Sequence, residues 1–314
     1  MKKRFHLLCF LAAVGMILFQ SCTKEESTDP PKAGIFYSIA GKQVAFTALT
    51  KRVVTWNWDF GDGMSSSDIN PVHVYADGGY YHVIFTGTDA SGRTAVDSAN
   101  LAVELTPYVL MTGGPTAVNG KTWKLTANHP AQDRLALADA AYSLADPDIP
   151  ALPQGAFGLF LGIGEVYDDE YTFYFNGDYA HDTKADNAAF AGYVNQLLTN
   201  GGTGIVSDGG GAASEFGLCT ALYTPEAGAT FTYVEKENFA VPSVWGDGGV
   251  VTYANVSTLD FSGTEFVGFL DYQRKVIVQN VTDNTMRLVM FMCGSPDYYP
   301  LNTHALILTF EVVK

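Results

Sequence analysis

The amino-acid sequence predicts an all-β protein in which a small domain precedes a larger one. Three observations carry this prediction. Residues 33–105 alternate short apolar-polar runs with turn residues, and many closely spaced strand-like runs follow from residue 118. Helical spacing of apolar residues is found in only one or two short segments. Short strands separated by regular turns are typical of antiparallel β-sandwiches and barrels.

The N-terminus has the pattern of a secretory signal, predicted over residues 1–21. A basic start at Lys2, Lys3 and Arg4 precedes an apolar run over residues 7–19, which is too short for a stable membrane-spanning helix. The run leads to Cys22, and residues 18–22 resemble a lipobox, with Phe19 in place of the commoner Leu. This resemblance implies that Cys22 carries an acyl anchor in a membrane lipid. The alternative is an ordinary signal peptide that is cleaved nearby.

The residues after Cys22 have the pattern of a sorting signal. The sequence Thr-Lys-Glu-Glu over residues 23–26 resembles the signal that sends Bacteroidetes lipoproteins to the outer face of the outer membrane. The resemblance implies a lipid-anchored protein of the outer membrane that faces the cell exterior. Residues 22–32 are predicted to be a polar linker, and a plain linker without an address is the alternative.

The charge of the chain limits its partners. The sequence has 18 Lys and Arg against 33 Asp and Glu, a net charge of −15. Removing residues 1–21 takes away three basic and no acidic residues, so the net charge becomes −18. Nucleic acids and polyanionic glycans would be repelled, whereas neutral glycans stay possible ligands. Cys219 and Cys293 lack the spacing of a zinc site. They are predicted either to form one disulfide bond or to stay as two buried thiols.

The first domain contains strands with a clear two-residue period. Trp56, Trp58 and Phe60 fall on one face of a predicted strand, which ends at Gly61-Asp62-Gly63. Tyr81, Val83 and Phe85 form a second alternating strand. Such alternation indicates strands with one buried face, so residues 33–105 are predicted to form a β-sandwich.

The motifs of this domain resemble a known family. Residues 58–63, Trp-Asp-Phe-Gly-Asp-Gly, match the signature of the PKD (polycystic kidney disease) domain, and residues 70–75, 79–83 and 88–92 match its later blocks in order. The resemblance implies an immunoglobulin-like β-sandwich that acts as a spacer or contacts a partner. Trp56 and Trp58 are predicted to be core residues, with ligand binding by Trp56 as the alternative.

Residues 106–117 are predicted to be a linker because they contain Pro107, Gly113, Gly114 and Pro115. Residues 118–314 then form the larger domain. Phe190, Val194, Leu197 and Leu198 recur at helical spacing, with Asp186 as N-cap and Gly201 as the end. Residues 135–144 predict a second, weaker helix.

The rest of the larger domain is predicted to consist of strands. Strand-like runs cover residues 170–175, 230–234, 250–253, 258–261, 275–281, 286–292 and 305–313. Asp283-Asn284 is a turn between two of them. We expect a jelly-roll-like antiparallel sandwich, with a lipocalin-like β-barrel as the alternative.

Two groups of carboxylates are candidates for catalysis or for metal binding. The sequence has no Gly-x-Ser-x-Gly and no His-Glu-x-x-His motif. Of the adjacent Asp168, Asp169 and Glu170, only Asp168 and Glu170 would share a face of a strand, and a charged strand entry is the alternative to a glycosidase pair. Asp146 and Asp148 are candidates for a calcium site; no other cofactor is expected.

Two loops have the composition of a sugar-binding surface. Trp245 and Asp247 lie among glycines, and Asp297, Tyr298 and Tyr299 lie between two prolines. Sugars stack their apolar faces on exposed aromatic rings while polar groups beside the rings bond the hydroxyls. The alternative for each loop is an aromatic plug that closes the core.

The order of anchor, small sandwich and larger β-domain resembles surface glycan-binding lipoproteins of Bacteroidetes. The resemblance implies a non-catalytic protein that binds a neutral polysaccharide or oligosaccharide, in contact with outer-membrane glycan-uptake proteins. Two alternatives from other classes are a glycoside hydrolase and an adhesion or structural lipoprotein that contacts a protein.

Overall fold

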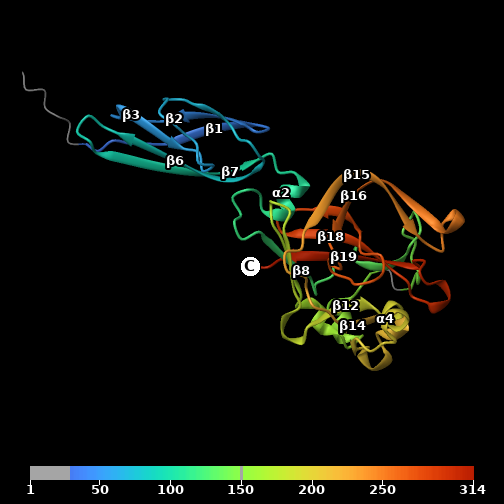
Figure 1. The fold of residues 1–314 in the computed structure, drawn as a ribbon. Helices are drawn as coiled ribbons and strands as arrows, with labels where there is room; N and C mark the ends of the chain where they lie inside the picture. The colour runs from blue at the N-terminus through green and yellow to red at the C-terminus, as the bar shows by residue number, and fades with distance from the viewer. Residues whose placement is uncertain (1–28, 149–150) are drawn as a thin grey trace, which may run out of the picture.

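A computed structural model describes residues 29–148 and 151–314 (Figure 1). Cys22 and the predicted signal peptide therefore lie outside the described residues. The small N-terminal domain extends away from the larger domain, and helix α2 lies where the two meet (Figure 1). The described part of the chain is mostly β-structure with antiparallel strand pairing, which confirms the all-β prediction.

The first domain is a sandwich of two antiparallel sheets. One sheet has the order β1-β2-β5 and the other β4-β3-β6-β7. The strands are β1 (Ile35–Ala40), β2 (Gln43–Ala48), β3 (Thr55–Asp59), β4 (Ser65–Ser66), β5 (Val72–Val74), β6 (Gly79–Thr88) and β7 (Thr94–Val103). The inward positions of both sheets supply the buried core, as the alternation in the sequence predicts.

The Trp-Asp-Phe-Gly-Asp-Gly motif serves the structure of this domain. The Trp58 side chain is fully buried and stacks on Phe85, with ring centroids 4.4 Å apart. The carboxylates of Asp59 and Asp62 accept hydrogen bonds from backbone N–H groups two residues further on, at 2.9 and 3.0 Å. Such bonds hold the turn that follows the strand. Trp56 is half-buried and packs against the same core.

The segment predicted as a linker, residues 106–117, is folded. It contains helix α2 (Pro107–Thr112), and the Thr106 hydroxyl accepts a hydrogen bond from the Val109 N–H as an N-cap. Met111 is completely buried, and its carbonyl accepts a 2.8 Å hydrogen bond from the indole N–H of Trp123. Pro107 is the first residue of this helix and Gly113 is its C-cap, so both residues mark the ends of a helix and are not part of a flexible linker. The core of the second domain therefore reaches back to Tyr108, which packs against it.

Contacts between the two domains surround the start of β6. The Thr116 hydroxyl donates a 2.7 Å hydrogen bond to the Tyr80 carbonyl. The Tyr80 hydroxyl donates to the Asp283 carboxylate in the turn between β17 and β18. A side chain at Gly79 would approach Pro115 to 3.0 Å. The domains therefore touch beyond the chain that connects them.

Within the described residues, a nine-stranded antiparallel sheet forms the second domain's centre. Its order is β11-β10-β8-β19-β18-β17-β16-β15, and β9 also pairs with β19. An isolated bridge between Asp178 and Thr230 joins the β11 end of the sheet to the β15 end, so the sheet curls into a half-barrel. The strands are β8 (Lys121–Leu125), β9 (Arg134–Leu137), β10 (Glu170–Phe173), β11 (Tyr179–Asp182), β15 (Phe231–Pro242), β16 (Val250–Phe261), β17 (Val276–Val281), β18 (Thr285–Met292) and β19 (His304–Val312).

A smaller sheet with the order β12-β14-β13 lies beside the half-barrel (Figure 1). Its strands are β12 (Ala188–Gly192), β13 (Ile205–Ser207) and β14 (Leu218–Leu222). The remaining elements are the short α3 (Ala156–Leu159), α4 (Tyr193–Asn200) and the 3-10 helices η1 (Gly164–Tyr167), η2 (Lys184–Asp186), η3 (Gly209–Gly211), η4 (Ser214–Phe216), η5 (Asp247–Gly249) and η6 (Pro296–Tyr298).

The helix predictions need two corrections. Helix α4 ends at Gly201 as predicted, but it begins after Gly192. Phe190 lies in β12, and the Asp186 carboxylate accepts a hydrogen bond from the Ala188 N–H and not from a helix. Residues 135–144 form no helix: after β9, the Asp139 carboxylate accepts from Ala141 and Ser143 and holds a turn.

The central sheet of the second domain buries residues on both faces: one cluster is rich in aromatic residues, and a second contains Phe239 and Phe291. Trp123 is fully buried in the first cluster, as predicted. Cys219 and Cys293 are buried free thiols, the second of the two alternatives for these residues. Among the described residues, no helix has both the length and the apolar character needed to cross a membrane.

Candidate functional site

The two aromatic loops singled out in the sequence are neighbours in the structure. One loop, residues 243–249, connects β15 to β16, and the other, residues 293–303, connects β18 to β19. The Val244 N–H donates to the Asn302 carbonyl at 3.1 Å, and the Asn302 N–H donates to the Pro242 carbonyl at 3.0 Å. These bonds fix the loops against each other. We call their joint exposed face, which carries Trp245 and Tyr298, the aromatic loop surface.

Trp245 is held in place by its own polar atoms. Its indole N–H donates a 2.7 Å hydrogen bond to the Thr303 carbonyl, and its backbone N–H donates to the Ser243 hydroxyl at 3.2 Å. The residue is nevertheless 51% exposed. Because the N–H is satisfied internally, the exposed part of the ring offers a largely apolar surface in a fixed orientation.

The two tyrosines of the second loop have different roles. Tyr298 is 52% exposed and belongs to the surface. Tyr299 turns inward: its ring meets Tyr272 edge to face at 5.6 Å, and its hydroxyl donates to the Asn195 side-chain oxygen at 3.3 Å. Tyr299 therefore matches the plug alternative, while Trp245 and Tyr298 remain available to a ligand.

Carboxylates lie on both loops of the surface. Asp247 is in η5 and Asp297 is in η6, and both are exposed. As acceptors beside exposed rings they suit the hydroxyl groups of a neutral sugar. Trp245, Asp247, Asp297 and Tyr298 thus lie on two loops from separate parts of the sequence, which backbone hydrogen bonds join.

A buried acid behind this surface was not predicted. Asp271 is 1% exposed, and its carboxylate accepts a 2.7 Å hydrogen bond from the Tyr272 N–H. Burial raises the pKa of Asp271 to about 7. A side chain at Gly192 would lie 2.1 Å from its second oxygen. The residue shows no sequence signal because its burial depends on segments distant in the chain.

The other carboxylate candidates have structural partners. The Asp146 carboxylate accepts a 2.9 Å hydrogen bond from the Asp148 N–H, and both residues are exposed. Within residues 29–148 and 151–314, no group of three or more His, Cys, Asp or Glu side chains is arranged to hold a metal ion. Among the described residues, therefore, no third His, Cys, Asp or Glu side chain joins Asp146 and Asp148 to form the predicted calcium site.

The acidic run at residues 168–170 also differs from a catalytic pair. Glu170 forms a 2.8 Å ion pair with Lys184. The buried member of the run is Asp169, which is 2% exposed. Burial and the nearby negative charges of Asp186 and Asp168 raise the pKa of Asp169 to about 8. The run is thus a strand entry with one buried acid.

Comparison with known proteins identifies the first domain. A family model of the PKD domain matches residues 36–103. Residues 36–103 form a PKD domain. Two collagenases of Bacillus cereus contain similar segments: ColA is 36% identical over 56 residues and ColQ1 is 38% identical over 53 residues. These segments cover 18% and 17% of this chain but only 6% of each collagenase.

Solved structures also have similarity to this chain. The PKD1 domain of Vibrio anguillarum Epp is 28% identical, with a TM-score of 0.25, and covers 26% of this chain and 100% of that domain. A carbohydrate-binding module of the β-sandwich superfamily covers 92% of this chain and 94% of its own, at 13% identity and a TM-score of 0.27. These scores are too low to support an argument, so the assignment rests on the family model for the PKD domain alone.

Proposed function

We propose that this protein is a non-catalytic, lipid-anchored surface protein whose second domain binds a neutral polysaccharide or oligosaccharide through the aromatic loop surface. The observation that carries the proposal is Trp245, whose ring is half exposed although its N–H is already bonded to Thr303. A ring in a fixed orientation loses little conformational entropy when a sugar stacks on it.

Charge supports a neutral ligand. The chain carries 33 acidic against 18 basic residues, and the charged residues named on the aromatic loop surface, Asp247 and Asp297, are both acidic. Acidic glycans would be repelled by these carboxylates, whereas the hydroxyls of neutral sugars can donate hydrogen bonds to them.

The PKD domain suits the role of a spacer. Its Trp58 is completely buried, and the carboxylates of Asp59 and Asp62 are bonded within their own turns. The motif residues are thus already engaged within the domain, and the exposed tryptophan among the described residues is Trp245 in the second domain.

A Trp245→Ala variant tests the glycan site. A glycan array on the mature chain selects a neutral ligand, and calorimetry then compares affinities. We expect the variant to lose about 1–3 kcal/mol, about one to two decades in affinity, because a stacking ring is removed. Phe36→Ala is the matched control, since Phe36 is an exposed ring of the PKD domain, 61% exposed. An unchanged affinity in folded Trp245→Ala would contradict the proposal, and cleavage of the glycan would contradict its non-catalytic part.

The anchor is tested separately at Cys22. Radiolabelled palmitate is expected to enter the wild-type protein and not Cys22→Ala, and protease added to intact cells is expected to degrade the wild-type protein. Label in the variant would refute lipidation at Cys22. Full protection from protease in intact cells would refute the outward orientation.

A further inference from the structure

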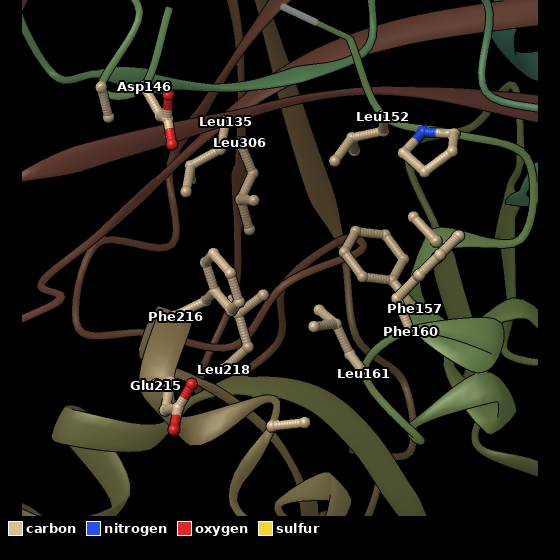
Figure 2. Close-up of a pocket in the computed structure, with 14 residues that line it drawn as sticks. Leu135, Asp146, Leu152, Phe157, Phe160, Leu161, Glu215, Phe216, Leu218 and Leu306 are labelled. Atoms are coloured by element: carbon tan, nitrogen blue, oxygen red, sulfur yellow. The ribbon is translucent and has the colours of Figure 1, made fainter. Parts of the chain in front are cut away.

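An apolar pocket separate from the aromatic loop surface opens between α3, η4 and the strands β9, β14 and β19 (Figure 2). Its volume is about 470 Å³. Of the described residues, those that line it are Leu135, Ala145, Asp146, Leu152, Pro153, Ala156, Phe157, Phe160, Leu161, Ala212, Glu215, Phe216, Leu218 and Leu306. Phe216 lies across the pocket from Phe157 and Phe160 (Figure 2).

One wall of the pocket is braced by a buried polar network. The Phe157 N–H donates to the Tyr167 hydroxyl at 3.1 Å, and that hydroxyl lies 2.8 Å from His129 Nε2. His129 Nδ1 lies 3.1 Å from the Asp133 carboxylate, which accepts hydrogen bonds from the N–H and hydroxyl of Thr309 on β19. The network therefore ties α3 to the central sheet.

The opposite wall of the pocket, which includes η4, is held against the α3 side by a close backbone approach between Gly209 and Leu161. Gly209 has a φ of +66°, and a side chain there would lie 1.7 Å from the Leu161 carbonyl oxygen, so only glycine fits. The Asp208 carboxylate accepts from the N–H groups of Gly210 and Gly211, and its carbonyl accepts from Ala213 just before η4. Hydrogen bonds and close backbone packing thus hold both α3 and the segment that precedes η4.

The polar groups of the lining are two carboxylates. Asp146 and Glu215 are both exposed, and the other lining residues named above are apolar. Figure 2 shows the two carboxylates on one side of the pocket, on either side of the Phe216 ring. Two negative charges repel an anionic headgroup and attract a cationic one. A sugar would find few partners for its hydroxyls among these side chains.

We propose that this pocket binds a small amphiphile with an apolar body and a protonated amine headgroup. The apolar body fills the space between Phe157, Phe160 and Phe216, and the amine lies towards Asp146 and Glu215. The volume falls within the range of about 300–1,000 Å³ that is usual for small-molecule sites. This site is distinct from the aromatic loop surface and does not depend on the proposed glycan binding.

Three probes with the same ten-carbon chain test the headgroup preference. Calorimetry on the mature chain with Cys22→Ala, below the micelle concentrations, compares decylammonium, decanol and decanoate at pH 7. Decylammonium is expected to bind about threefold or more tighter than decanol, because exposed ion pairs each add a modest attraction. Decanoate is expected to bind most weakly. Decanoate binding as tightly as decylammonium would overturn the proposal.

Variants of the lining locate the binding. Ala212→Phe is expected to weaken all three probes about tenfold or more by filling the pocket, whereas Ala227→Phe, at an exposed turn, should change nothing. Phe160→Ala, at a ring 62% exposed, is expected to weaken all three probes without disturbing the fold. The double variant Asp146→Asn, Glu215→Gln should abolish the difference between decylammonium and decanol. Unchanged binding in both Ala212→Phe and Phe160→Ala would overturn the proposal.

Discussion

The aromatic loop surface and the apolar pocket both contain aromatic rings, but they fix those rings differently. At the loop surface, Trp245 uses its own N–H to bond the Thr303 carbonyl. In the pocket, the Phe157 ring has no polar atom, and its backbone N–H is bonded to Tyr167 instead. The loop surface therefore combines ring faces with polar neighbours, whereas the pocket presents apolar side chains with charges only at Asp146 and Glu215.

In the two binding proposals, the groups around a ring, more than the ring itself, select the class of ligand. A sugar needs acceptors and donors beside the stacking face, which Asp247 and Asp297 and the loop backbone supply. An alkyl chain needs no hydrogen-bonding partners, and a protein carboxylate near the end of the bound chain selects a cationic headgroup. Of the following predictions, one acts on the pocket side of this comparison, one acts behind the loop surface, and one acts on the contact between the two domains.

The largest effect is expected on the pocket side, from Asp133→Ala. Asp133 is fully buried, and its removal leaves the N–H and hydroxyl of Thr309 and the His129 ring without their acceptor. Unsatisfied buried groups cost about 1–3 kcal/mol each, so the free energy of unfolding is expected to fall by about 3 kcal/mol in urea titrations. Decylammonium affinity should fall while glycan affinity is unchanged.

Asp133→Asn is the matched control for this prediction. The amide keeps one oxygen acceptor for Thr309, so a smaller loss of stability is expected. Equal unfolding free energies for Asp133→Ala and Asp133→Asn would mean that the network does not brace the wall as described.

Behind the loop surface, an effect that is smaller per pH unit is expected from the titration of Asp271. Burial raises the pKa of Asp271 to about 7 in the folded state, above 3.8 for an ordinary Asp. Between about pH 4 and pH 7 the unfolded chain loses this proton while the folded protein keeps it, so stability falls as pH rises, by at most about 1.4 kcal/mol per pH unit. Below this window both states are protonated, and above it both are ionised.

Asp271→Asn is therefore expected to lose less stability than the wild type between pH 4.5 and pH 7.5, as measured by urea unfolding at each pH. Asp297→Asn, an exposed loop position, is the control and should follow the wild-type profile. Parallel profiles for Asp271→Asn and the wild type would show that Asp271 is not the titrating group.

The smallest effect is expected from Tyr80→Phe, which touches neither surface. The variant removes the hydroxyl that bonds Asp283 across the two domains. This half-exposed contact should contribute about 1 kcal/mol or less, seen as faster hydrogen exchange around residues 113–120. Glycan and decylammonium affinities should not change. A change in either affinity would mean that the domain contact is coupled to a binding surface.

The sequence predicts best what is decided by neighbouring residues. The strand of Trp56 and Trp58 and the turn at Asp62 follow from local alternation and turn chemistry, and the structure has both. The helix assigned from Phe190 onward was wrong at its start, because β12 runs directly into α4 and the buried Phe190 belongs to the strand. Apolar spacing alone does not separate a buried strand from the first turn of a helix.

Features that depend on distant segments were missed. Trp245 and Tyr298 could each be proposed as exposed rings, but the Val244–Asn302 hydrogen bond that joins their loops spans more than fifty residues of sequence. Asp169 looks like an exposed charge among charges, yet tertiary packing buries it. The pocket has no motif in the sequence, because its lining comes from strands, α3 and η4, which only the fold brings together.

The bridge between Asp178 and Thr230 has a consequence for self-association. An open sheet ends in strands whose N–H and carbonyl groups can pair with another copy of the chain, which is a common route to aggregation. Here the curl brings the β11 end and the β15 end together, so that Tyr179 N–H bonds the Ala229 carbonyl and Phe231 N–H bonds the Gly177 carbonyl. Each end of the sheet therefore occupies, at this point, the pairing groups that a neighbouring molecule would otherwise recruit.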